Sequence, residues 1–276
     1  MKRNIWRWVN LGAFLAMVTV NVLANMLPLG GMTTGEISAQ YPSPLTPAPV
    51  AFMIWSVIYV GLLLTVIYQM TSAANAENGV MLSRKLGPWF VGSCLANMGW
   101  IFSWHFGAQT LAMIFMFVLL VTLVFMERKV RGMNRSWKER LMVKAPFSLY
   151  FGWMTVATIA SVSVWLMSLG FTGLGIPSQV WQAVVVFIGG MIVSVGIFKN
   201  RDPLFGLAAM WGYAGILVRQ LSGSMLNFQY PFAVMMLFLC EALFLMMIVM
   251  VIWPTLVEKI CDANLSRHNT MKTEEK

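Results

Sequence analysis

Residues 46–59 read TPAPVAFMIWSVIY, a proline-bearing segment that leads directly into an apolar stretch. Trp55 and Tyr59 stand four residues apart in the apolar part, so on a helix the two rings share one face. Both residue types prefer the interface between membrane and water. The stretch therefore predicts a membrane helix that presents two large rings side by side just inside the boundary.

The composition of the whole chain agrees with a membrane protein. Of its 276 residues, 59% are hydrophobic and only 11% are charged, whereas a soluble domain carries roughly 25% charged residues. A helix needs about 20 residues to cross the hydrocarbon core. We expect an all-α, polytopic membrane bundle of about eight transmembrane helices, at residues 5–27, 50–70, 89–106, 109–126, 146–169, 180–198, 203–220 and 230–253.

The positive charges predict the orientation. The net charge is +9, and every Lys and Arg except Arg219 falls in alternate segments between the spans or at the two termini. The segments 28–49, 107–108, 170–179 and 221–229 contain neither residue. Cytoplasmic loops carry the excess of Lys and Arg, so both termini are expected in the cytoplasm and the bacterial plasma membrane is the expected location. The bilayer explains this charge better than nucleic acid does, because no basic face with interleaved aromatics lies outside the spans.

The sequence shows no catalytic or metal-binding pattern. Cys94, Cys240 and Cys261 form no CxxC pair and are expected as free thiols. No hydrolase elbow, Walker loop or dinucleotide fingerprint occurs in a suitable context. We therefore predict no enzyme activity, no metal and no cofactor.

Three polar side chains within the spans need a partner, because a charge at the membrane centre costs about 2.5–3.5 kcal/mol on insertion scales. Glu241 lies near the middle of the last span and is either a coupling carboxylate or a protonated, hydrogen-bonded group. Arg219 ends the seventh span and either reaches the outer interface or faces inward to hold a ligand. His105, in the outer half, is either an interfacial histidine or part of a polar patch.

Two further spans repeat the aromatic pattern. Asn97 and Trp100 are three residues apart, as are Tyr150 and Trp153, so each pair shares a helix face. These residues are read either as packing and interfacial anchors or as the walls of a pocket for a hydrophobic molecule.

Taken in order, these motifs resemble the tryptophan-rich sensory proteins, also called the translocator or TspO/MBR family. The family's proline loop followed by Trp-x-x-x-Tyr is matched by Pro47, Trp55 and Tyr59; its Asn-x-x-Trp motif by Asn97 and Trp100; and its fifth-helix motif by Tyr150, Trp153 and Ala157. The sequence departs from the family pattern at Thr46, Pro49, Met53, Leu149 and Ser161.

The resemblance implies a five-helix bundle at residues 1–169 and a ligand pocket beneath the first loop. It implies that the pocket is floored by Trp55, Asn97 and Trp153, with Pro47, Tyr59, Trp100, Tyr150 and Ala157 beside it. Residues 170–258 are then three additional transmembrane helices, and residues 259–276 a polar, disordered cytoplasmic tail.

The expected function is binding of a hydrophobic or aromatic small molecule, of the porphyrin- or sterol-like class, in sensing or transport. One alternative is a secondary transporter coupled through Glu241 and Arg219. Another is a non-catalytic membrane regulator, and a homodimer is left open.

Overall fold

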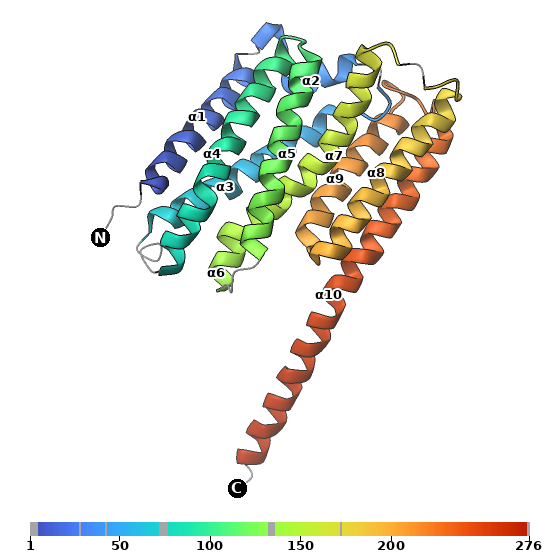
Figure 1. The fold of residues 1–276 in the computed structure, drawn as a ribbon. Coiled ribbons are helices and arrows are strands. Elements are labelled where there is room, and N and C mark those ends of the chain that lie inside the picture. Colours follow the sequence, from blue (N-terminus) through green and yellow to red (C-terminus); the bar gives the residue numbers. More distant parts are fainter. Residues whose placement is uncertain are drawn as a thin grey trace.

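A computed structural model describes residues 5–27, 29–41, 43–71, 77–131, 136–171 and 173–274. These residues form helices and no strand (Figure 1). The main helices are α1 (Trp6–Met26), α2 (Thr34–Gln40), α3 (Ile54–Met70), α4 (Glu77–His105), α5 (Gln109–Arg131), α6 (Trp137–Glu139), α7 (Ala145–Ser168), α8 (Ser178–Asn200), α9 (Pro203–Leu221) and α10 (Pro231–Glu274). Shorter helical turns are η1 (Leu29–Gly31), η2 (Pro49–Met53) and η4 (Arg140–Lys144).

The long helices confirm a polytopic helical membrane bundle. Among the described residues, 7 helices are long and apolar enough to cross a membrane, and these contain α1, α3, α5, α7, α8, α9 and α10. The remaining predicted span, 89–106, is the third along the chain and falls in α4, which packs beside α5 (Figure 1). Polar residues such as Asn97 and His105 lower the hydropathy of α4, which explains why it falls outside the seven.

The described residues build two hydrophobic cores. The first lies among α1, α3, α4, α5 and α7, and its fully buried side chains include Ile58, Phe90 and Trp153. The second lies among α7, α8, α9 and α10, and its buried side chains include Val156, Tyr213 and Phe244. Helix α7 therefore contributes to both cores and joins the two groups of helices.

Small residues allow α9 to approach α7 closely. A Cβ atom added at Gly152 of α7 would lie 2.3 Å from the Phe205 carbonyl oxygen of α9, and one added at Gly212 would lie 2.8 Å from Val156. Such distances leave no room for a side chain, so glycine is required at both positions. Helix α9 is consequently held tightly against the five-helix group.

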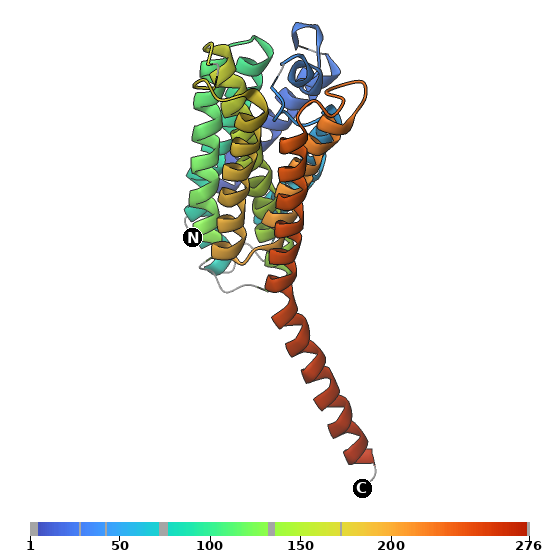
Figure 2. The ribbon, with the colours of Figure 1, turned by 90° about the vertical axis from the view of Figure 1, so that its right-hand side faces the viewer.

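Two helices are longer than the sequence predicted. Helix α4 begins at Glu77 and passes through Pro88, where the predicted span began just beyond the proline. Helix α10 passes through Pro254 and continues to Glu274, projecting away from the bundle (Figure 2). The predicted disordered tail is therefore helical as far as Glu274. Low apolar content suggested disorder, but residues such as Glu, Lys, Leu and Met favour helix even without a core.

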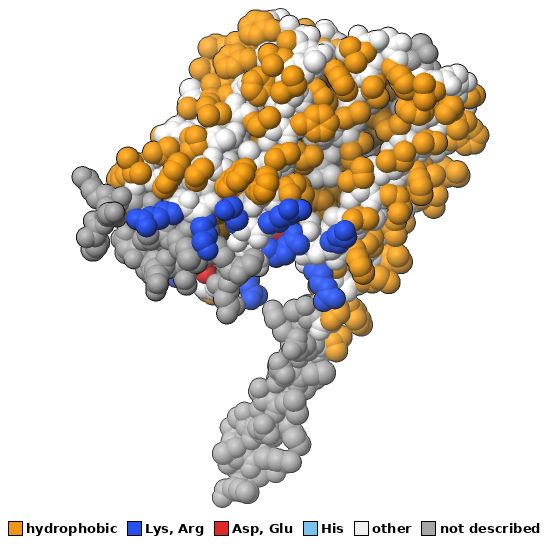
Figure 3. All heavy atoms as spheres, in the orientation of Figure 1, with side chains coloured by type: hydrophobic (Ala, Val, Ile, Leu, Met, Phe, Trp, Pro, Cys, Tyr) orange, Lys and Arg blue, Asp and Glu red, His pale blue; other side chains and the backbone are white. Residues whose placement is uncertain are grey.

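The basic side chains gather at one end of the bundle (Figure 3). They come from the last turns of α5 and α8, from α6 and from η4. The opposite end carries α2, the turn between α4 and α5, and the loops that follow α7 and α9. Arg219, the exception in the charge pattern, belongs to the last turn of α9 at that opposite end.

Candidate functional site

The aromatic residues singled out in the sequence meet in one cluster around Trp55. The Trp55 ring stacks on Tyr59 with centroids 5.5 Å apart and lies 6.0 Å from Trp100. It also makes edge contacts with Tyr150 and Trp153, at 5.6 and 6.3 Å. Rings from α3, α4 and α7 thus converge, as expected if the two pairs on α4 and α7 face the same space as the pair on α3.

A buried polar chain runs behind these rings. Asn97 is completely buried; its Oδ1 accepts a hydrogen bond from Asn21 at 2.6 Å, and its Nδ2 donates to the Tyr150 hydroxyl at 3.3 Å. Asn21 also donates to the Met17 carbonyl within α1 at 2.9 Å. The chain ties α1, α4 and α7 together at the level of the cluster and holds the Tyr150 ring in place.

The segment that follows α1 covers the cluster at the end of the bundle opposite the basic side chains. We define the capping segment as residues 34–41 and 43–53, which contain α2 and η2. The Trp104 indole donates to the Thr34 carbonyl at 3.3 Å, and Phe52 contacts Trp153 with centroids 5.8 Å apart. The capping segment is therefore fastened directly to α4 and α7.

Helix α2 starts with a capping box at its N-terminus. The Thr33 hydroxyl accepts from the Glu36 amide, while the Glu36 carboxylate accepts from the Thr33 amide at 2.7 Å. That backbone bond, and then the Thr33 hydroxyl, hold the pKa of Glu36 below its usual value. Burial raises the pKa of Tyr41, whose hydroxyl accepts from Gln109. A threonine followed three residues later by glutamate is a helix-start signal, so this helix could have been predicted from the sequence within the segment 28–49, where no helix was expected.

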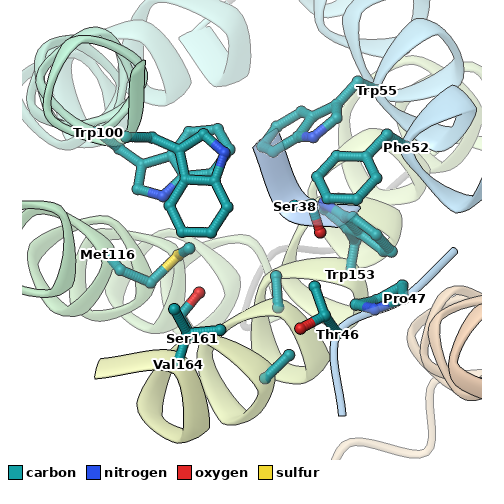
Figure 4. A pocket seen from close by; sticks show the side chains of 13 residues that line it. Ser38, Thr46, Pro47, Phe52, Trp55, Trp100, Met116, Trp153, Ser161 and Val164 are labelled. Carbon is teal, nitrogen blue, oxygen red and sulfur yellow. The ribbon is translucent and has the colours of Figure 1, made fainter. Parts of the chain in front are cut away.

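A small cavity lies between the capping segment and the rings (Figure 4). Trp100 and Met116 lie across it from Phe52, Trp153 and Pro47. Its further lining residues are Ser38, Thr46, Trp55, Trp104, Ala157, Ala160, Ser161 and Val164. The free volume is about 30 Å³, which holds one or two water molecules.

A larger cavity lies on the other side of Phe52 and Trp55. It measures about 500 Å³ and is bounded by α1, α3, α4 and the capping segment. Asn21, Thr34 and Tyr59 contribute polar groups to its wall. Small-molecule pockets commonly measure 300–1,000 Å³, so this cavity has the size for a ligand, and the small one has not.

Several buried polar atoms around these two cavities have no hydrogen-bond partner among the described residues. They are the Trp153 Nε1 and Ser38 Oγ atoms on the small cavity, and the Tyr59 hydroxyl and Thr34 Oγ1 on the large one. Buried polar groups are paired in the great majority of cases. The four atoms are therefore available to donate or accept hydrogen bonds at the cavity walls.

The structure brings together eight of the predicted ligand-binding positions. Trp55, Tyr59, Trp100, Tyr150 and Trp153 form the ring cluster. Asn97 supports it, and Pro47 and Ala157 line the small cavity. Ser38, Phe52, Trp104 and Met116 also line it and were missed by the sequence reading. Of these, only Trp104 carried a signal, because it stands four residues after Trp100.

The three polar candidates lie apart from this cluster. His105 Nδ1 contacts the Ile101 carbonyl oxygen of its own helix at 2.9 Å. Arg219 faces inward, but its guanidinium binds backbone carbonyls of the capping segment. Glu241 lies on α10, and its Oε1 has no hydrogen-bond partner among the described residues. No salt bridge joins Glu241 to Arg219 in the part of the chain that the structure describes.

The side chains of the described site are mainly aromatic and apolar. Within the described ranges, no group of three or more His, Cys, Asp or Glu side chains could hold a metal ion. The cluster offers aromatic faces, amide and hydroxyl groups and one indole N–H. Such a surface suits a flat, mostly apolar molecule with a few hydrogen-bonding groups.

Comparison with known proteins agrees with the motifs. The model of the TSPO-like protein family matches residues 7–253. The match continues through α8 and α9 and far into α10, whereas the resemblance seen in the sequence was expected to end at residue 169. Comparisons with curated proteins and with solved structures found no match. Because the family model covers most of its length, the chain belongs to the TSPO-like protein family.

Proposed function

We propose that this membrane protein binds a flat hydrophobic molecule, of the porphyrin- or sterol-like class, at the Trp55 cluster and uses it in sensing or transport rather than turnover. The observation that carries the proposal is the set of unpartnered polar atoms on both sides of Trp55 and Phe52. A ligand with hydrogen-bonding groups at its edges would pair them.

The two cavities suggest how the ligand is held. The body of the molecule occupies the cavity of about 500 Å³ against Tyr59 and Thr34. One edge reaches past Trp55 and Phe52 toward the Trp153 indole and Ser38. Phe52 and Trp55 line both spaces, so a rotation of these two side chains would join them.

The orientation predicted from the charges is part of the proposal. The end with the gathered basic side chains faces the cytoplasm, where anionic lipid favours Lys and Arg, and both termini lie on that side. The bacterial plasma membrane is the proposed location. The capping segment then faces the outer side, so a ligand enters from the outer side or from the outer half of the bilayer.

The test is a titration of the purified protein with protoporphyrin IX, followed by quenching of tryptophan emission, with a sterol as competitor. We expect saturable binding that weakens about tenfold or more in Trp55→Ala and in Asn97→Ala. Trp89→Ala is the matched control, because Trp89 stacks on Phe125 away from the cluster, at a centroid distance of 4.3 Å. Absence of saturable binding by either ligand class, or equal weakening in all three variants, would rule out this site.

A further inference from the structure

One face of α9 is directed at the capping segment. Trp211, Gly215 and Arg219 stand four residues apart and therefore form a stripe along the helix. The Trp211 indole donates to the Ala51 carbonyl at 2.8 Å, and the Gly215 carbonyl accepts from the Ala48 amide at 2.9 Å. Each position of the stripe thus contacts the backbone of the capping segment, Arg219 through the Tyr41 carbonyl.

The end of the stripe makes the densest set of bonds. Arg219 is 5% exposed and Gln220 is fully buried. Their side chains donate hydrogen bonds to the carbonyl oxygens of Ser38 (3.3 Å), Ala39 (3.3 Å), Tyr41 (2.8 Å) and Pro44 (2.7 Å). A guanidinium presents several donors in one rigid plane, so Arg219 can hold consecutive carbonyls at once.

These bonds act on the wall of the proposed ligand site. Ser38, whose carbonyl Arg219 binds, also places its unpartnered hydroxyl on the small cavity. Thr46 and Pro47 lie between the Pro44 and Ala48 contacts and line the same cavity. The position of this wall therefore depends on α9, which contributes no residue to the lining of the cavity.

Close packing fixes the stripe itself. A Cβ atom added at Gly215 would lie 2.5 Å from the Ala51 Cβ atom, so the backbones of α9 and the capping segment are in contact. On another face, the Tyr213 hydroxyl donates to the Val186 carbonyl of α8 at 3.1 Å. Helix α9 is thus anchored to its neighbours and offers a rigid support.

We propose that α9 holds the capping segment closed over the ligand site, with Arg219 and Gln220 as positioning residues. This proposal rests on the proposed function only in calling the cavity a ligand site. The hydrogen bonds between α9 and the capping segment are independent of that function. The proposal gives the last three helices a role, which is to set how readily the site opens to the outer side.

The test measures opening without any ligand. In a variant whose three cysteines are replaced by alanine, Thr46→Cys places a thiol at a position that is 3% exposed. The reaction rate with a water-soluble maleimide then reports opening of the capping segment. Adding Arg219→Met should raise this rate about tenfold or more, the change expected from losing hydrogen bonds of a charged donor. Arg219→Lys should give an intermediate labelling rate, because an ammonium group keeps the charge but lacks the planar set of donors of the guanidinium.

Two further variants keep the test decisive. Tyr213→Phe removes one buried hydrogen bond of the same helix away from the capping segment, and the rate should stay within about twofold of the parent. If Arg219→Met does not fold, Gln220→Leu removes only the bond to Pro44 and should still raise the rate measurably. The proposal is overturned if the labelling rate is unchanged in folded Arg219→Met. If only Gln220→Leu folds, an unchanged labelling rate in that variant overturns it. An equal rise of the labelling rate in Tyr213→Phe also overturns it.

The same variants separate this proposal from the proposed function. Release of bound protoporphyrin IX should accelerate in Arg219→Met by about the same factor as labelling. If no variant, including the parent, binds protoporphyrin IX or a sterol while labelling still rises, the ligand proposal fails and the support by α9 stands. If binding is normal and labelling is unchanged, the proposed support by α9 fails and the ligand proposal stands.

Discussion

Replacing Asn97 by leucine should destabilise the bundle by an amount that the structure allows us to work out. The substitution keeps the side-chain volume but removes the bonds to Asn21 (2.6 Å) and Tyr150 (3.3 Å). Hydrogen bonds between membrane helices contribute about 0.6 kcal/mol on average and up to about 1.7 kcal/mol. The Tyr150 hydroxyl, which is fully buried, also loses its partner. We expect a loss of about 1–3 kcal/mol in the free energy of unfolding.

The assay is thermal unfolding in detergent micelles, followed by circular dichroism, where a loss of this size lowers the midpoint by roughly 3–10 °C. Ser103→Ala is the control, because its hydroxyl bonds only to the Gly99 carbonyl of the same helix and its loss should cost about 0.5 kcal/mol or less. The double variant Asn97→Leu/Tyr150→Phe should lose less than the sum of the single changes, since both partners then go together. The proposed role of the buried polar chain would be refuted if Asn97→Leu unfolded at the wild-type midpoint. It would also be refuted if the stability losses of the two single variants were fully additive in the double variant.

Three further predictions concern the capping segment and the inner end. Gly215→Val should displace the capping segment at Ala51 and cost about 1–3 kcal/mol of stability, measured by the same unfolding assay; a neutral result would contradict the close contact. Because the pKa of Glu36 is lowered in the folded state, its contribution to α2 is complete above its usual value of about 4.5 and is lost as the pH falls below it. A spin label on α2 should gain mobility over that range, and Glu36→Gln should abolish the pH dependence. Ser148→Ala removes the 2.6 Å bond to buried Asp202 and should cost about 1–3 kcal/mol, where an unchanged midpoint would show the bond to be dispensable.

The sequence located the rings because helical spacing is a local property. Trp55 and Tyr59, and the pairs on α4 and α7, follow from positions three or four residues apart. That Trp55 meets Trp153 also depends on the order of helices around the bundle, which spacing cannot give. The resemblance to a family supplied that order, and the ring contacts agree with it.

Contacts between distant segments were not predictable in the same way. Arg219 was expected either at the outer interface or facing a ligand, and it instead binds carbonyls about 180 residues earlier in the chain. Nothing in the local sequence of α9 shows that the capping segment presents those carbonyls. The two cavities also depend on side-chain packing in three dimensions, so neither their sizes nor their unpartnered polar atoms could be read from the chain.

The ends of the helices were the other feature that could not be predicted reliably from the sequence. The capping box at Thr33 and Glu36 marks the start of α2, but a proline-rich neighbourhood made a loop the simpler expectation. The predicted spans 89–106 and 230–253 stop next to Pro88 and Pro254, and both prolines lie inside helices. Proline disfavours a helix interior, yet neighbouring groups in a membrane bundle can compensate for the lost hydrogen bond.

The central claim is that a hydrophobic small molecule occupies the space around Trp55. The most direct measurement is native mass spectrometry of the protein purified gently from its own membrane, followed by identification of whatever is released. We predict one apolar, ring-bearing molecule per chain in the wild type, and its loss in Trp55→Ala and Asn97→Ala but not in Trp89→Ala. A wild-type protein that carries only ordinary phospholipid, in the same amount as the variants, would contradict the claim.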